Sequence, residues 1–513
     1  MSSSPRNGVT ILRGIDDPNL FAPWFKDRTT WRSWFVFLKA LFALPLSANE
    51  LALYQQCTGR ETAPTAPSTE GWLICGRRSG KSFTLALIAV FLATFKDHRQ
   101  FLAPGERGVV MLIAADRKQA RVIFRYIRAL LLGVPMLAKL VRRETAESFD
   151  LNNAVSIEVA TASFRTTRGY SIVAALLDEA AFFRTDDSAN PDTEIIAALK
   201  PAMATIPGAM LLCASSPYAQ RGALFDAFKR HYGKDGSVLV WKAATRVMNP
   251  TVPQRVIDEA MEADPASAGA EYLAEFRTDV EAYIARDVVE AAVVAGRYEL
   301  PRVEGAAYHA FVDPSGGSSD SMTLGIAHME GERFIHDVVR ERRAPFSPDD
   351  VVREFSETLK AYGIDRIHGD RYAGEWPREA FRKCGIEYRV ADKTKSEIYL
   401  AMLPLLNSGR VELLDDKRLV AQLCSLERRT SRAGKDSIDH VPGGHDDVVN
   451  AVAGCVVLAA DAAAVAASEP KIVVPFVGTA SDLGAVVRPG SGVPQHYLKQ
   501  PAAWRAYVKP LSY

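Results

Sequence analysis

The run Gly76-Arg77-Arg78-Ser79-Gly80-Lys81-Ser82 has the residue types of a loop that binds phosphate groups. It lies between an apolar run and the apolar helical pattern 83–95, which is the context that such a loop requires. Its glycines let backbone N–H groups approach phosphate oxygens, and the helix N-terminus adds partial positive charge. Lys81 can reach the β- and γ-phosphates of ATP, and Ser82 can hold Mg²⁺. The usual spacing would place the first glycine at Cys75, so a simple glycine turn before a helix is the alternative.

Two later motifs have the groups that ATP hydrolysis needs. Asp178 and Glu179 end an apolar run; Asp178 would sit behind Mg²⁺, and Glu179 would polarise the attacking water. Ser215 and Ser216 end another apolar run, and hydroxyls at the C-terminal end of a strand face the nucleotide crevice of an α/β sheet. Either serine could sense the γ-phosphate. Taken alone, each motif could also be an ordinary strand end or turn.

Acidic residues punctuate the second half of the chain at separate points. Asp313 and Asp370 each end a predicted strand, and Asp446 and Asp447 begin the last apolar helix. Clustered carboxylates bind Mg²⁺ or Mn²⁺ through oxygen. Two such ions, roughly 4 Å apart, can activate water and stabilise the leaving oxygen of a phosphodiester. Structural strand ends and helix N-caps are the alternatives, and we expect His445 to support the acids rather than bind metal.

The elements that must position these residues follow two patterns. Apolar runs separated by helical patterns predict a parallel sheet covered on both faces in the first half. Its strands are expected at 72–75, 109–114, 156–160, 173–177 and 210–214, and a further strand is expected at 238–241, in the region that follows. In the second half, close strands followed by alternating helix and strand give the order of an RNase H-like fold, in which the first and fourth strands are neighbours and the last helix packs across them. These strands are expected at 309–313, 323–328, 333–339, 366–370, 387–390 and 411–414.

Chain length, charge and cysteine distribution limit the classes of protein that fit these patterns. A chain of 513 residues exceeds one ordinary core, so several domains are expected. Lys plus Arg total 62 against 61 acids, so a surface that binds nucleic acid must be local. The dispersed cysteines favour neither a zinc site nor a disulfide framework. The start of the chain lacks an apolar signal core, and we expect the apolar stretch 451–467 to be a buried helix rather than a membrane span.

We expect the chain to divide into successive segments. These are an N-terminal helical segment 1–70, a P-loop ATPase core 71–265, a linker or hinge 266–305, an RNase H-like nuclease 306–465 and a proline-rich basic tail 466–513. Lys393 and Lys395 lie near the predicted acidic cleft. Contact with a DNA backbone and a solvated helix start are both open for these two lysines.

Taken in order, the motifs resemble the large terminase subunits of tailed bacteriophages, from about Trp31 to Ala460. The segment around Gln56 looks like the one that borders the adenine. Residues 76–82 look like the terminase form of the phosphate loop, which accounts for the departure at Cys75. Arg168 looks like the arginine that reaches a neighbouring subunit's nucleotide, and Arg77 competes with it for the γ-phosphate.

The same resemblance extends to the other motifs. It implies an ATPase of the ASCE/RecA-like P-loop type with Glu179 in hydrolysis and Ser215 and Ser216 in coupling, followed by the RNase H-like nuclease. Asp313, Asp370 and the cluster 445–447 match the nuclease. Relatives with the same His-Asp-Asp run favour Asp447 over Asp446 as the third metal ligand.

The resemblance also implies partners and a setting. A small terminase subunit and double-stranded DNA would recruit the protein, which would dock on the portal protein of the procapsid as a homo-pentamer in the host cytoplasm, with no membrane partner and no place in the mature virion. ATP and Mg²⁺ would be its cofactors, with Mn²⁺ an alternative at the nuclease. A DNA repair helicase with a fused nuclease and a non-catalytic packaging adaptor are the rival hypotheses. The state of the isolated chain, monomer or oligomer, stays open.

Overall fold

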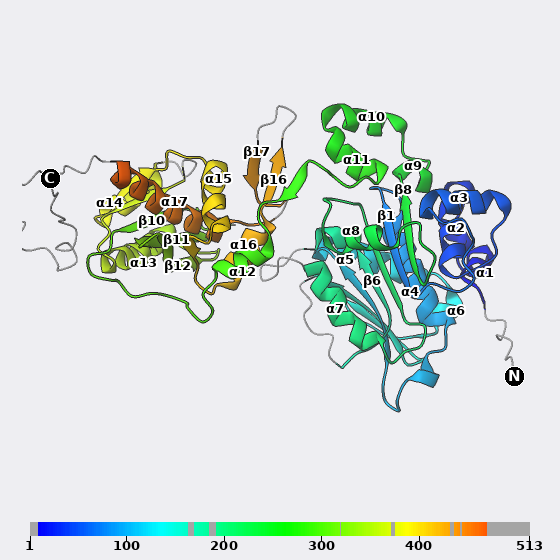
Figure 1. The fold of residues 1–513 in the computed structure, drawn as a ribbon. Coiled ribbons are helices and arrows are strands. Elements are labelled where there is room, and N and C mark those ends of the chain that lie inside the picture. The colour runs from blue at the N-terminus through cyan, green and yellow to red at the C-terminus, as the bar shows by residue number, and fades with distance from the viewer. Residues whose placement is uncertain are drawn as a thin grey trace, which may run out of the picture. The chain divides into compact units, whose positions relative to one another are not determined.

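The computed structural model describes residues 9–162, 169–183, 191–318, 320–370, 375–430, 436–441 and 444–468. The chain divides into compact units between Ala462 and Ala463. The first unit, Met1–Ala462, contains both large sheets (Figure 1). Arg168 and most of the predicted tail lie outside the described residues, and the domain limits expected from the sequence stay a prediction.

The first sheet has eight strands in the order β3-β4-β5-β2-β6-β7-β1-β8. The six strands from β5 to β8 in this order are parallel, and five of them, all but β8, form the parallel sheet that the apolar runs predicted. The strands are β1 Glu70–Cys75, β2 Gly108–Ala114, β3 Val141–Glu144, β4 Ser148–Leu151, β5 Val155–Thr161, β6 Ser171–Asp178, β7 Met210–Ser215 and β8 Val238–Ala243. The antiparallel pair β3 and β4 at one edge was not predicted, because β3 is short, charged and largely exposed.

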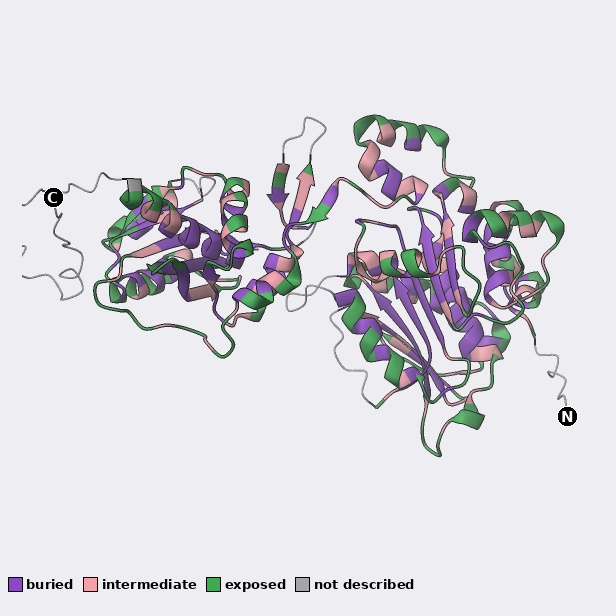
Figure 2. Cartoon of the chain, viewed as in Figure 1, coloured by how far each residue is buried: buried purple, intermediate pink, exposed green. Residues whose placement is uncertain are grey.

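Helices cover both faces of this sheet, and successive residues of β1 show why. Leu73 and Cys75 belong to one buried cluster, which also includes apolar residues of α4 (Lys81–Phe95) and α5 (Arg117–Leu132). Trp72 and Ile74 belong to another, with residues of α7 (Pro191–Met203) and α8 (Gly222–His231). Because side chains of a strand alternate between faces, a strand apolar at every position must be covered twice. The central strands β2, β6 and β7 are accordingly buried at every position, and the outer helix faces are exposed (Figure 2).

The N-terminal segment is helical and aromatic-rich, as predicted. It contains α1 Ile11–Asp16, α2 Arg32–Leu41 and α3 Ala48–Thr58, together with short 3-10 turns at Ala22–Trp24 and Arg28–Trp31. Trp34 and Phe37 of α2 are fully buried in the same cluster as α4. This segment therefore packs on the helix that follows the phosphate loop.

The region between the two large sheets combines short helices with a strand. Its elements are α9 Thr245–Met248, α10 Gln254–Ala263, α11 Pro265–Leu273, β9 Val280–Ala282 and α12 Arg286–Ala292. Strand β9 joins β16 (Glu427–Thr430) and β17 (Asp436–Asp439) in a small antiparallel sheet. The sequence did not predict this sheet, because its strands are short and largely charged, and β9 is far from the other two in the chain.

The second large sheet has the order β14-β13-β10-β11-β12-β15. Strands β10, β11 and β12 are antiparallel, and β13 pairs in parallel with β10, so the first and fourth strands are neighbours as predicted. Its strands are β10 Tyr308–Asp313, β11 Met322–Glu330, β12 Arg333–Arg342, β13 Arg366–Gly369, β14 Glu387–Val390 and β15 Val411–Glu412. Its helices are α13 Pro348–Ala361, α14 Trp376–Lys383, α15 Lys395–Asn407, α16 Lys417–Ser425 and α17 Asp447–Ser468. This is the strand order of an RNase H-like fold.

Helix α17 packs directly across the middle of this second sheet. A Cβ atom added at Gly454 would lie 2.2 Å from the Phe311 ring, and one at Gly325 would lie 2.6 Å from the Ala451 carbonyl oxygen. Among the described residues, α17 is the helix long and apolar enough to cross a membrane, with 61% of its apolar window buried inside the protein. Its packing matches the expected core helix.

Candidate functional site

The phosphate loop connects β1 to α4 at the C-terminal edge of the first sheet. Gly80 has a φ of 101° and Arg78 a φ of 63°, so the loop turns sharply before the helix begins. At Gly76, a Cβ atom would lie 2.2 Å from Thr245 Oγ1 and 2.8 Å from the Tyr272 carbonyl oxygen. Cys75 is the buried last residue of β1, paired with Ala243. The close approach that demands glycine therefore falls at position 76, which gives a structural reason for the unusual spacing.

Lys81 lies at the centre of the first candidate site. Its side chain is almost completely buried, and its ammonium group donates to the carbonyl oxygens of Cys75 at 3.0 Å and Gly76 at 3.2 Å. It also donates to Ser216 Oγ at 3.2 Å and lies 3.3 Å from Glu179 Oε1. A single lysine thus joins all three sequence motifs of the predicted ATPase.

Ser82 and Asp178 form the candidate cation position. Ser82 Oγ donates to Asp178 Oδ2 at 2.6 Å, and Gln119 Nε2 of α5 donates to the same oxygen at 2.9 Å. Asp178 Oδ1 is buried and has no hydrogen-bond partner within the described residues. Burial, followed by the charge of Glu179, raises the pKa of Asp178 to about 6. A hydroxyl beside an unpaired buried carboxylate oxygen fits Mg²⁺, which takes oxygen ligands.

Glu179 is held against the segment that follows β7. Its backbone is left-handed, with a φ of 56°, and its Oε2 accepts from Ser215 Oγ and from the Ser216 backbone N–H, both at 3.1 Å. The order β6-β7-β1 explains this contact, because β7 separates the strand that ends in Asp178 from the strand that precedes the loop. Both serines therefore contact Glu179, the predicted water-polarising acid, and Ser216 also contacts Lys81.

The arginines and the adenine-bordering residue are placed less centrally. Arg77 is exposed and pairs with Glu271 of α11 at 2.9 Å. Arg168 lies outside the described residues, so the choice between the two arginines stays open. Gln56 is exposed on α3, while Tyr54 beside it is fully buried. The adenine role of Gln56 stays a prediction.

Other residues that support the loop carry no sequence motif. Trp34 Nε1 donates to the Ser79 carbonyl oxygen at 2.8 Å, and Asn249 Nδ2 donates to the Arg78 carbonyl oxygen at 2.8 Å. Thr245 Oγ1 donates to the Arg77 carbonyl oxygen at 2.8 Å. These residues are far from the loop in sequence, so spacing gave no signal for them. They fix the loop so that its backbone can face a ligand.

The second candidate site lies where β10, β13 and α17 meet. Val312 pairs with Gly369 in parallel register, so the next residues, Asp313 and Asp370, end adjacent strands. Loss of water around the carboxyl raises the pKa of Asp313 well above its usual range, and the charges of Asp447, Asp446 and Asp370 raise it further. The other three predicted acids are therefore within electrostatic reach of Asp313.

Asp446 and Asp447 are adjacent in sequence but have different surroundings. Both oxygens of Asp446 lie near Lys395 Nζ, at 3.3 and 3.0 Å, and Tyr399 Oη donates to one of them at 2.8 Å. Asp447 Oδ2 is buried without a hydrogen-bond partner in the described part of the chain. Burial raises the pKa of Asp447 to about 6. Asp447 thus offers an uncommitted oxygen that fits a hard cation, whereas Asp446 is already paired.

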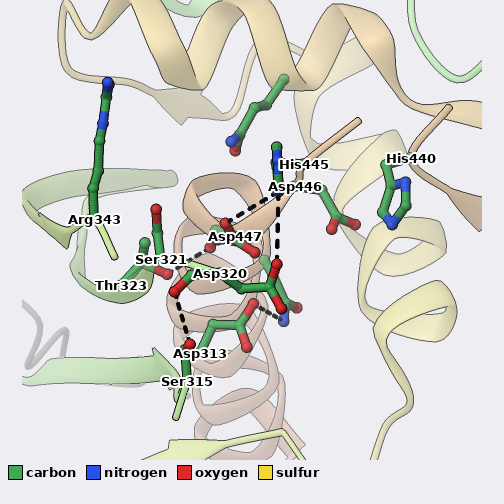
Figure 3. A network of polar contacts seen from close by, with 12 residues as sticks. Asp313, Ser315, Asp320, Ser321, Thr323, Arg343, His440, His445, Asp446 and Asp447 are labelled. Carbon is green, nitrogen blue, oxygen red and sulfur yellow. Dashed lines mark hydrogen bonds and ion pairs between the residues drawn. The ribbon is translucent and has the colours of Figure 1, made fainter. Parts of the chain in front are cut away.

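Further polar residues surround Asp447 and Asp313 (Figure 3). Asp313 Oδ2 accepts from Asn450 Nδ2 at 2.9 Å. His445 Nδ1 lies 4.0 Å from Asp447 Oδ2 and 3.9 Å from Asp320 Oδ1, a supporting position as expected. Asp320 and Asn450 were not singled out from the sequence, because neither belongs to a motif.

A neighbouring group of residues also has the spacing of metal ligands. Ligand atoms of Asp439, His440 and Asp446 all lie within 4.8 Å of one another. Lys395 Nζ lies 2.9 Å from Asp439 and 3.0 Å from Asp446, so a positive charge already stands beside them. The sequence did not point to Asp439 or His440.

Comparison with known proteins gives structural likenesses only. No protein-family model matches the chain, and neither does any curated protein. It is similar to the HK97 bacteriophage large terminase at 17% identity and TM-score 0.33, over 76% of this chain and 91% of that one. It is similar to the large terminase of a thermophilic bacteriophage in complex with ATP-gamma-S, at 12% identity and TM-score 0.35. That match covers 83% of this chain and 98% of the other. It is also similar to the large terminase nuclease of thermophilic phage G20c with bound magnesium, at 16% identity and TM-score 0.30. That match covers 33% of this chain and 94% of the other.

Proposed function

We propose that the chain is the large subunit of a tailed-phage terminase, which moves double-stranded DNA into a procapsid by hydrolysing ATP and cuts concatemeric DNA with a metal-dependent nuclease. The observation that carries the proposal is the presence of two separate polar sites on two sheets of one chain. One site joins a buried lysine to a hydroxyl and two carboxylates. The other gathers acids at the ends of β10, β13 and the start of α17.

In the ATPase site, the loop 76–80 would surround the phosphates, and Lys81 would move from its present carbonyl partners to the β- and γ-phosphates. Mg²⁺ held by Ser82 and Asp178 would neutralise phosphate charge. Glu179 would take the proton from the attacking water. Loss of the γ-phosphate would change the contacts of Lys81 with Ser216, which supports a sensing role for Ser215 and Ser216.

In the nuclease site, Asp313, Asp370 and Asp447 would hold Mg²⁺ or Mn²⁺, which would supply charge neutralisation at the scissile phosphate. The residues of the chain orient this set. Asn450 holds Asp313, and Thr323 Oγ1 donates to the Asp447 carbonyl oxygen at 2.6 Å. His445 lies on the open side, where it can contact a phosphate oxygen.

The assembly expected for such a motor is also a proposal. The small terminase subunit would deliver DNA, and a homo-pentamer would dock on the portal protein in the host cytoplasm. Arg77 or Arg168 would reach a neighbouring subunit's nucleotide, since added positive charge favours phosphoryl transfer. The pairing of Arg77 with Glu271 means that Arg77 must first leave α11 to do so.

Two substitutions test the proposal in the full-length chain. Glu179→Gln should abolish ATP turnover and packaging but leave metal-dependent DNA cleavage intact, because the residue lies on the first sheet. Asp313→Ala should abolish cleavage and leave ATP turnover intact. Full ATP turnover by Glu179→Gln would refute the hydrolysis assignment, and DNA cleavage by Asp313→Ala in Mn²⁺ would refute the nuclease assignment.

A further inference from the structure

Asp446 is a buried carboxylate with a complete set of partners. It is 5% exposed, and Lys395 Nζ lies 3.0 Å from one oxygen and 3.3 Å from the other. Tyr399, which is fully buried, donates its hydroxyl to Asp446 Oδ2 at 2.8 Å. A buried charge without a partner is strongly unfavourable, and an ammonium group with three donors offsets that cost. Asp446 therefore has no oxygen that is free of a protein partner.

Lys395 is held in place by the start of α15. Thr394 and Glu397 form a capping box around this helix start. Ser396 Oγ accepts from the Ile438 backbone N–H at 2.9 Å, which ties α15 to β17. The Lys395 ammonium group then lies 2.9 Å from Asp439 Oδ1 at the end of β17. The Lys395 ammonium group thus lies beside Asp439, His440 and Asp446, whose potential ligand atoms are close enough together to hold a metal ion.

Asp447 shows the opposite pattern one residue later. Its Oδ2 is buried and finds no hydrogen-bond partner in the described ranges. Its charge acts on Asp313, whose own Oδ2 is oriented by Asn450. The two adjacent aspartates thus differ: Asp446 is bonded to the Lys395 ammonium group, whereas Asp447 Oδ2 has no hydrogen bond from any described residue and lies 4.0 Å from His445 Nδ1.

We propose that Lys395 is a positioning residue of the nuclease site, whose ammonium group fills the cation position formed by Asp439, His440 and Asp446 and so leaves Asp447, rather than Asp446, to bind the metal. This proposal rests on the nuclease function proposed above. It predicts that the lysine excludes a metal ion from a set of ligands that could otherwise hold one.

The test measures how many Mn²⁺ ions the full-length chain binds in the absence of DNA. The electron paramagnetic resonance signal of free Mn²⁺ reports the amount that stays unbound. Lys395→Met should bind one more Mn²⁺ ion per chain than the unaltered protein. Lys395→Arg should match the unaltered protein, because it keeps the positive charge. Lys393→Met is the matched control, since Lys393 is a nearby lysine that pairs instead with Asp461 at 2.5 Å. ATP turnover and circular dichroism establish that each variant is folded.

Variants of the two aspartates complete the test and do not depend on Lys395→Met folding. Asp447→Asn should lower Mn²⁺ affinity at least tenfold, and Asp446→Asn should leave it within a factor of two to three. Combining Asp446→Asn with Lys395→Met should remove the additional ion. An unchanged Mn²⁺ count in folded Lys395→Met, or loss of Mn²⁺ in Asp446→Asn but not in Asp447→Asn, would overturn the positioning role alone. Absence of Mn²⁺ binding by the unaltered chain would overturn the nuclease proposal as well.

Discussion

Asp178 and Asp447 share a feature at the scale of single residues. Each has a buried carboxylate oxygen that no described residue hydrogen-bonds, and burial raises the pKa of each to about 6. Buried polar atoms are normally paired, and an unpaired one calls for an explanation. The divalent cations proposed above would account for both oxygens, because each cation would complete the coordination of the unpaired oxygen. We therefore propose that each residue marks the cation position of its own candidate site.

Gln119 offers a test of the first cation position. Its amide donates to Asp178 Oδ2 at 2.9 Å. Gln119 therefore orients Asp178, the proposed metal ligand, without itself binding the metal. Loss of such a supporting partner typically weakens metal binding by about 10–100-fold. Gln119→Leu should therefore raise the Mg²⁺ concentration that half-saturates ATP turnover by about that factor, while DNA cleavage stays unchanged.

The matched control for Gln119 is its neighbour in α5, Lys118, which is exposed. Lys118→Met should leave the Mg²⁺ dependence of ATP turnover as it is in the unaltered protein. If Gln119→Leu had the same Mg²⁺ dependence as Lys118→Met, Gln119 would have no role at the cation position.

At the scale of elements, α17 links the core of the second sheet to its acids. The helix begins at Asp447 and packs so closely on β10 that a Cβ atom at Gly454 would clash with Phe311. Phe311 lies two residues before Asp313 on the same strand, and both therefore point to the same face of the sheet. The contact between Gly454 of α17 and Phe311 of β10 therefore supports both the core of the sheet and the position of Asp447 relative to Asp313.

Gly454→Ala tests this link. The added methyl group would overpack the helix against Phe311, which typically costs about 1–3 kcal/mol of unfolding free energy. It should also lower DNA cleavage, since displacement of α17 separates Asp447 from Asp313. Thermal unfolding and cleavage rates check both expectations.

An exposed site in the same helix provides the comparison. Ala464→Val enlarges α17 at an exposed position near its end and should change neither stability nor cleavage appreciably. If Gly454→Ala behaved like Ala464→Val, the close packing of α17 on β10 would be refuted.

The sequence predicted the elements that repeat a strong pattern. The fully apolar strands of the first sheet and the strand order of the second followed from hydrophobic runs, and β13 took its expected place beside β10. The small sheet of β9, β16 and β17 was missed, because strands such as Glu427–Thr430 are charged and pair over long distances in the chain. Burial by tertiary contacts, rather than local propensity, makes these segments strands.

Candidate site residues divide in the same way. Lys81 and Asp178 belong to contiguous motifs, whereas Gln119, Asn450 and Asp320 do not. Lys395 was noted only as a lysine near the predicted acidic cleft, and its contacts with Asp439 and Asp446 follow from the fold. Single residues on distant elements carry no spacing that would mark them. Only the fold reveals which of them face the motifs.

At the scale of the whole molecule, the two candidate sites lie on two separate sheets of one chain. Residues after β7 also reach the small sheet, because Tyr218 Oη donates to Glu427 Oε2 at 2.7 Å and Arg221 pairs with Glu427 at 2.6 Å. Glu427 is fully buried, with Arg429 as a further partner at 3.1 Å. The segment 215–221 thus contacts both Glu179 and β16, a strand that precedes α17 in the chain.

The central claim is that one chain holds two distinct sites for divalent cations. The most direct measurement is an anomalous difference map from a crystal of the full-length protein grown with Mn²⁺ and a non-hydrolysable ATP analogue. We expect one Mn²⁺ position bonded to Ser82 and Asp178 and a separate one bonded to Asp313, Asp370 and Asp447. Peaks confined to Asp439, His440 and Asp446, or no Mn²⁺ beside Asp313 and Asp447, would contradict this expectation.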